Sequence, residues 1–482
     1  MTGKDRPAVT LSQGIILGIQ IDEEYPQSLD LFLGIPYANP PVGKNRFKLP
    51  EKVQKSSDTF DASEYGDAAP GKALLSGCLD LNQSENCLTA NIFRPSNFSG
   101  HLPVALYLHG GAFNRGAAAM HDTASMVAWS EAPFIGVSFG YRIGALGFLP
   151  STQKRPLFHR VIMESGSPTS RAIRPYNAKI HEEQFRDFLK EVGCPDNLAS
   201  TEIFQFLRNM PSSTIINAQT IVFDKYNPSL RWPFQPVVDR DIIPCKPLEA
   251  WNSGSWFRVP IMTGFNTNEA NVYVDKTMSD PSQFRMFWQT LLPDLSESEL
   301  DSIEELYPDP QNDPGSKYNV TGEGLGSQFR RIEAAYGHYA YVAPVRQTAH
   351  IASSSESLVY LYHWALPRTV LGASHADNMY YETYNKTTRG ISDSQNELSG
   401  TLHAYLTSFI TTGDPNTLRK RYPERPRWIP FSPEKKNIMI FGQDNEELVG
   451  GKAAAPAKMV RDEWAREETE FWWSKTDISQ MA

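Results

Sequence analysis

A glycine-rich loop after a short apolar run is the first feature of this sequence that could do chemistry. Residues 104–108 read Val-Ala-Leu-Tyr-Leu, and Gly110, Gly111 and Ala112 follow shortly after. Such a loop can direct backbone N–H groups at the oxygen that becomes negative during acyl transfer, because glycine allows a close backbone approach. This chemistry also needs a nucleophile, which a G-x-S-x-G turn normally presents. We expect no such turn anywhere in the 482 residues.

Apolar runs alternate with helical patterns beyond residue 100, and this alternation predicts the scaffold that holds the loop. One helix is expected over 179–192 and another over 396–412, each followed by a glycine typical of a C-terminal cap. Because the apolar runs are continuous, they suit a sheet covered on both faces. We therefore expect an α/β fold with a mostly parallel central sheet flanked by helices. The expected strands cover 104–108, 134–139, 161–163, 259–263 and 358–364.

Composition and charge narrow the classes of partner. The net charge of −9 is spread without long blocks of like charge, which argues against nucleic acid. No apolar run approaches the roughly 18 residues of a membrane span. No signal peptide is visible at the start, so a cytoplasmic protein is the default expectation. A secreted, glycosylated protein remains the alternative, because the sequence has four Asn-x-Ser/Thr sequons. They begin at Asn82, Asn97, Asn319 and Asn385.

Eight strings of residues occur in a fixed order along nearly the whole chain. Together they resemble the type-B carboxylesterase/lipase family, the branch of the α/β-hydrolases that includes cholinesterases. The resemblance implies an α/β-hydrolase fold in a single domain over residues 1–482. The strings are FLGIPYANPPVGKNRFKLP (32–50), SENCLTANIFRP (84–95), LPVALYLHGGAF (102–113), FGYRIGALGFLPS (139–151), FHRVIMESGSP (158–168), GFNTNEA (264–270), GASHADNMYY (372–381) and TTGDPN (411–416).

The resemblance also implies roles for single residues. His375 corresponds to the base that takes a proton from a serine hydroxyl, and Glu269 to the acid that orients the imidazole. The family usually has Asp-Glu-Gly around that acid, whereas Asn268 and Ala270 flank it here. Ser165 resembles a serine that supports the triad. The alternative for His375 is an ordinary surface or core histidine, and the alternative for Glu269 is a solvated loop glutamate. The implied substrate is a small carboxylic ester, and no cofactor or metal is implied.

Two pairs outside the triad follow from the same resemblance. Arg46 and Glu85 correspond to a buried ion pair of the family and are expected to meet. Cys87 corresponds to the second cysteine of the family's first disulfide, and Cys78 is its candidate partner. The loop between these two cysteines is shorter than usual, so a bridge and two free thiols remain alternatives.

The nucleophile is missing because a block of the family pattern is missing. In the family, the segment that resembles 140–148 is followed by a helix, a strand, the nucleophile turn and another helix. Two strand–helix–strand units need roughly 60 residues. Here 18 residues, 143–160, separate Arg142 from Val161, which places an internal deletion near 151–155.

The deletion should remove the central strand that carries the nucleophile, together with its adjoining helices. We expect that strand to separate 134–139 from 161–163, so these two strands must either pair directly or face each other unpaired. Unpaired buried backbone groups cost about 1–3 kcal/mol each, which makes the second outcome expensive.

Two functions fit these observations. The first is a carboxylic-ester hydrolase whose present chain is incomplete and inactive. The second is a non-catalytic, cholinesterase-like binding module on the same scaffold. Retention of His375 and Glu269 counts against the second.

Overall fold

The computed structural model describes residues 6–72, 81–146, 157–170, 173–319, 322 and 324–480. Its first large sheet has five strands in the order β3-β4-β6-β8-β7. The pairs β3–β4, β4–β6 and β6–β8 are antiparallel, and β7 runs parallel to β8. The bounds are β3 (Ile19–Ile21), β4 (Leu29–Pro36), β6 (Thr89–Pro95), β7 (Val104–Tyr107) and β8 (Ile135–Phe139).

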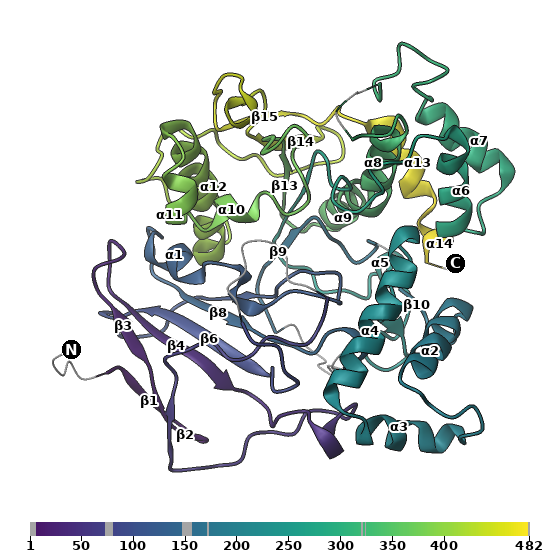
Figure 1. The fold of residues 1–482 in the computed structure, drawn as a ribbon. Coiled ribbons are helices and arrows are strands. Elements are labelled where there is room, and N and C mark those ends of the chain that lie inside the picture. Colours follow the sequence, from purple (N-terminus) through teal and green to yellow (C-terminus); the bar gives the residue numbers. More distant parts are fainter. Residues whose placement is uncertain are drawn as a thin grey trace.

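A second five-stranded sheet follows in the order β15-β14-β13-β12-β9. Here β9, β12, β13 and β14 are parallel, and only β15 is antiparallel to its neighbour. In Figure 1 the strands β13 to β15 lie apart from the purple and blue strands of the first sheet. The bounds are β9 (Val161–Glu164), β12 (Ile261–Asn266), β13 (Val359–Trp364), β14 (Asn437–Phe441) and β15 (Ala457–Arg461).

The two sheets end at β7 and β9, and these two strands do not pair with each other. Within the described ranges, no strand pairs with the outer edge of either one. Of the two expected outcomes, direct pairing or unpaired strands, the structure therefore shows unpaired strand edges at β7 and β9 in the described ranges. The prediction that 134–139 forms the edge of the first sheet was wrong. Strand β8 lies between β6 and β7, so β7 is the outermost strand. The expected deletion near 151–155 lies outside the described residues.

Helices cover both sheets. Helix α1 packs on β6 and β8, and α9 packs on β12 and β13. The α-helices are α1 (Thr123–Ala128), α2 (Lys179–Glu191), α3 (Ser200–Asn209), α4 (Ser212–Tyr226), α5 (Pro247–Ser253), α6 (Pro281–Leu291), α7 (Glu297–Leu306), α8 (Phe329–Gly337), α9 (Ala343–Ser354), α10 (Met379–Glu382), α11 (Lys386–Arg389), α12 (Asp393–Thr412), α13 (Arg466–Ser474) and α14 (Thr476–Ser479).

Short elements complete the fold. Two small sheets hold β1 (Ala8–Leu11), β2 (Gly14–Leu17) and β5 (Thr59–Asp61), and β10 (Arg174–Pro175) with β11 (Val237–Val238). The pairing of β1 with β2 is antiparallel. A π-helical turn, η5 (His338–Val342), joins α8 to α9. The 3-10 turns are η1 (Gly43–Asn45), η2 (Ala118–Met120), η3 (Gly144–Leu146), η4 (Asn227–Ser229) and η6 (Glu447–Val449).

The largest apolar cluster joins the two sheets through side chains. It contains Leu31 and Phe93 from the first sheet, Tyr362 and Trp364 from the second, and Leu402 from α12. Packing of this kind is close to that of an organic crystal, so the two sheets are held by a shared core although their hydrogen-bond ladders are separate.

Candidate active site

The expected acid and base lie on loops that follow neighbouring parallel strands. Glu269 comes shortly after β12, and His375 lies in the loop after β13. The two strands are in parallel register from Ile261 to Asn266, so their carboxyl ends meet at one sheet edge. Nδ1 of His375 lies 2.6 Å from Oε2 of Glu269. The structure thus brings together two residues that are 106 positions apart.

The surroundings of Glu269 fix its orientation. The side chain is fully buried, and its Oε1 accepts a hydrogen bond of 2.6 Å from the backbone N–H of Asn266. The rings of Tyr273 and Tyr341 flank the imidazole of His375, with centroids 5.4 and 4.7 Å away. Because the carboxylate accepts from Nδ1–H, Nε2 is left as the proton acceptor. This pair can therefore act as a base with its orienting acid.

The glycine-rich loop has donor groups that are not used elsewhere. The carbonyl of Gly111 accepts from the N–H groups of Asn114 and Arg115, at 3.1 and 3.2 Å. Within the described part of the chain, the N–H groups of Gly111 and Ala112 have no hydrogen-bond partner. Gly111 has φ +124, and a Cβ there would lie 2.0 Å from the Arg115 carbonyl oxygen, so no other residue fits. Free N–H groups in a fixed loop are what an oxyanion hole requires.

One string with the spelling G-x-S-x-G does occur, at residues 136–140, and the sequence analysis was wrong to expect none. Its serine, Ser138, lies inside β8, paired with Asn91 on β6 and Tyr107 on β7. The side chain is buried and its Oγ accepts from Nδ2 of Asn91 at 3.2 Å. A nucleophile elbow is an exposed turn between strand and helix. Ser138 is in the middle of a strand, so it presents no nucleophile.

Ser165 follows β9 and is buried, with φ +49. Its Oγ has no hydrogen-bond partner in the described ranges, so it forms no hydrogen bond with His375 or Glu269 there. The expected supporting role of Ser165 is therefore not realised by a hydrogen bond in this structure.

Arg46 and Glu85 meet as a buried pair. The Nε of Arg46 lies 2.5 Å from Oε1 of Glu85, and its second nitrogen lies 2.8 Å from Oε2. The same guanidinium donates to the carbonyls of Leu207 and Met210, and Ser212 donates to Glu85. Both charged groups thus have hydrogen-bond partners besides each other, as a buried ion pair requires.

The possibility of a cysteine bridge stays a prediction, because Cys78 lies outside the described residues. Cys87 is buried in a small apolar cluster, and burial raises the pKa of its thiol to about 12.

A second pair of acids, the half-buried Glu164 at the end of β9 and the buried Glu382 on α10, was not predicted from the sequence. Oε1 of Glu164 accepts from Nδ2 of Asn378 at 2.8 Å and from the hydroxyl of Tyr362 at 3.1 Å. Glu164 also hydrogen-bonds to Glu382, which requires a proton on one of the two carboxyls. Burial raises the pKa of both carboxyls. A lone glutamate in a strand gives no sequence signal of such a partner.

A buried arginine, Arg142, has no carboxylate partner among the described residues. Arg142 is 4% exposed and its Nε has no hydrogen-bond partner in the part of the chain that the structure describes. Burial lowers its pKa, and the groups that act against this are Cys87 and Tyr37, with no carboxylate among them. A buried guanidinium without a carboxylate is costly.

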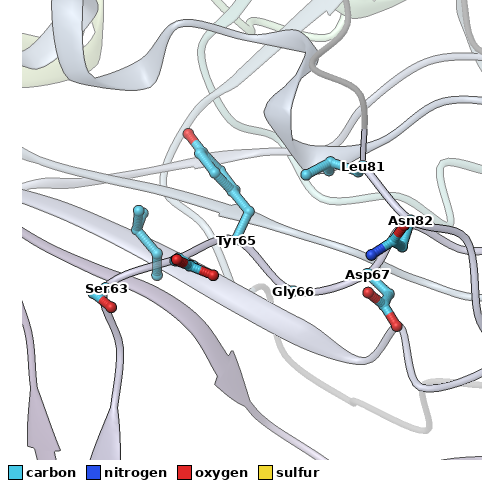
Figure 2. A pocket seen from close by; sticks show the side chains of 8 residues that line it. Ser63, Tyr65, Gly66, Asp67, Leu81 and Asn82 are labelled. Atoms are coloured by element: carbon cyan, nitrogen blue, oxygen red, sulfur yellow. The ribbon is translucent and has the colours of Figure 1, made fainter.

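Two pockets among the described residues lie away from the His375–Glu269 pair. One of about 410 Å³ is lined by Tyr65, Asp67, Leu81 and Asn82 among others, and Figure 2 shows these side chains. Neither Glu269 nor His375 lines it. Among the described residues, no group of three or more His, Cys, Asp or Glu side chains could hold a metal ion. No helix in the described ranges is long and apolar enough to cross a membrane.

A comparison with protein families identifies the class. The model of the carboxylesterase family matches residues 5–154 and 149–472. The chain therefore belongs to the carboxylesterase family, and the resemblance seen in the sequence is confirmed. The fold is also confirmed, because the crystal structure of EstA from Aspergillus niger superposes with a TM-score of 0.79. That structure is 21% identical and 99% of each chain is covered.

Several named relatives lie within this family. Secreted lipase 4 of Gibberella zeae is 28% identical, with 94% of this chain and 89% of the lipase aligned. Neuroligin-2 of Mus musculus is 23% identical over 98% of this chain and 68% of its own length. Acetylcholinesterase of Bungarus fasciatus is 24% identical over 80% of this chain and 75% of its own length. The relatives thus carry names of different functions.

Proposed function

We propose that this chain is an incomplete serine-dependent carboxylic-ester hydrolase that cannot form an acyl-enzyme. In the complete enzyme His375 would take the proton of the attacking serine, and Glu269 would hold the imidazole. The N–H groups of Gly111 and Ala112 would stabilise the negative oxygen of the tetrahedral intermediate. The observation that carries the proposal is the 2.6 Å contact between His375 and Glu269, with no serine hydroxyl placed against the imidazole among the described residues.

The exposed face of β7 supports a missing block. Val104, Leu106 and Leu108 lie on one face of this strand and the residue after it, and they are 61%, 55% and 62% exposed. Central strands of a parallel α/β sheet are normally covered on both faces. Three exposed apolar side chains at alternate positions indicate a face that is built to be covered.

The charge of Arg142, which has no carboxylate partner within the described ranges, supports the same view. Because burial without a carboxylate is costly, the sequence is expected to supply one, and the described residues do not. An acid in the missing block would supply it.

The match to the family model also divides near residues 151–155, where the deletion is expected. The family model matches in two pieces that overlap at residues 149–154. The alignment with the secreted lipase extends over 514 positions, whereas 94% of 482 residues is about 453. Summed over the whole alignment, about 61 positions have no residue in this chain, a total close to the roughly 60 that two strand–helix–strand units need.

A fluorophosphonate probe tests the proposal. The purified chain is incubated with the probe, and the intact mass is measured before and after. We expect no added mass in protein that shows a cooperative unfolding transition, because no serine hydroxyl is activated. Stoichiometric labelling that disappears in His375→Gln would refute the proposal. Ser138→Ala and Ser165→Ala would then identify the nucleophile.

A further inference from the structure

Glu333 is a buried acid behind the His375–Glu269 pair, and the proposed chemistry does not use it. It lies on α8 and is 2% exposed. Its Oε2 accepts from Nδ2 of Asn268 at 3.3 Å and lies 3.7 Å from the guanidinium of Arg330. Its Oε1 is buried without a hydrogen-bond partner in the described ranges. An acid that has a long hydrogen bond, a cation at 3.7 Å and one oxygen without a partner is poorly compensated.

Asn268 connects this acid to both members of the pair. It directly precedes Glu269 in the chain. Its backbone N–H donates to the carbonyl of Ala373 at 2.8 Å, and its Oδ1 accepts from the N–H of Ala373 at 3.2 Å. Ala373 lies two residues before His375. One asparagine thus ties Glu333 to the loop of the acid and to the loop of the base.

The helix of Glu333 also packs directly on the acid. A Cβ on Gly337, one turn further along α8, would lie 3.4 Å from the Cβ of Glu269. Helix α8 therefore forms the wall behind Glu269, and the charge of Glu333 acts on Glu269 through protein and not through water.

Two states of Glu333 are accessible near neutral pH. Burial raises its pKa to about 7, and the negative charge of Glu269 acts in the same direction. Arg330, Asn268 and the N–H of Ala270 oppose this shift. The phenol of Tyr318 also faces the carboxyl. A group that titrates near 7 beside a histidine pair is placed to change the behaviour of that pair.

We propose that Glu333 is a positioning residue that controls the protonation of His375 through Asn268 and Glu269. When Glu333 is neutral, Glu269 alone faces the imidazole. When it is ionised, a second negative charge lies behind Glu269 and favours the imidazolium form. The inference concerns the same pair as the proposed function, but it holds whether or not this chain attacks an ester.

Histidine NMR tests the inference on the full chain. The protein is labelled with ¹³C-histidine, and His375 is assigned by the signal missing in His375→Gln. In the wild type we expect the His375 titration to show a second inflection near pH 7 that follows Glu333. In Glu333→Gln that inflection disappears and the main midpoint moves down by roughly 0.5–1 pH unit, the size expected for one charge at this range.

Two further variants make the result specific. Glu468→Gln removes another buried carboxylate, one that pairs with Lys317, and should leave the His375 titration unchanged. Arg330→Gln removes the cation that favours ionised Glu333, so the second inflection should move to higher pH. It also tests the inference if Glu333→Gln does not fold. An unchanged His375 curve in Arg330→Gln or in folded Glu333→Gln would overturn the inference, whereas ester turnover plays no part in the readout.

Discussion

The exposed face of β7 leads to a stability prediction with an internal control. Leu106 on β7 is 55% exposed, whereas Leu361 on β13 is fully buried. Truncating a fully buried leucine to alanine costs about 2–5 kcal/mol, because transfer and cavity terms add. Less than half of the surface of Leu106 is buried, and its truncation leaves no enclosed cavity. Leu106→Ala should therefore cost about 1 kcal/mol or less. Leu361→Ala should cost at least twice as much.

Urea unfolding followed by tryptophan fluorescence measures both variants, since the chain has ten tryptophans. The expected result is a small shift of the midpoint for Leu106→Ala and a large one for Leu361→Ala, with equal slopes. The measurement is repeated at several protein concentrations. A cost for Leu106→Ala equal to that of Leu361→Ala would refute the reasoning, because it would mean that the face of β7 is covered in solution.

Two more predictions concern charged groups. Glu85→Gln leaves the charge of Arg46 buried with neutral partners only and should cost about 3–5 kcal/mol in the same urea assay. Asp61→Asn, which breaks an exposed pair with Arg6, should cost less than about 1 kcal/mol, and equal costs would contradict this view. The shared proton of Glu164 and Glu382 should make stability depend on pH. Because their pKa values are raised on folding, this stability is present in acid and is lost as pH rises through the folded pKa. Denaturation midpoints across pH should therefore flatten in Glu382→Gln, and an unchanged profile would speak against the shared proton.

Much of the scaffold could be predicted from the sequence. The expected run 358–364 matches β13 within one residue, and 179–192 matches α2 within one residue. The apolar stripe on α2 was only partly predicted, because Phe188 is buried whereas Phe185 is 39% exposed. Periodicity gives the helix but not the width of the face that its neighbours cover.

The site divides in the same way. The pairing of His375 with Glu269 followed from family strings, since no local pattern joins residues 106 positions apart. Glu333 could not be predicted, because its role depends on which loop packs against α8. The strand at the edge of the gap was also misplaced, because the order of strands in a sheet is not the order in the chain. Ser138 shows the reverse error, since its string has the right spelling in the wrong element.

The split between the two sheets has a consequence for how the chain folds. Each sheet is drawn from one continuous stretch, the first from residues 19–139 and the second from residues 161–461. Contacts such as the hydrogen bond from the His403 side chain to the Met126 carbonyl, at 3.0 Å, join the halves, and no strand pairing does so among the described residues. Cooperative opening tends to follow such supersecondary units. Backbone amides of the two halves should therefore exchange with solvent as two separate groups, each with its own opening free energy.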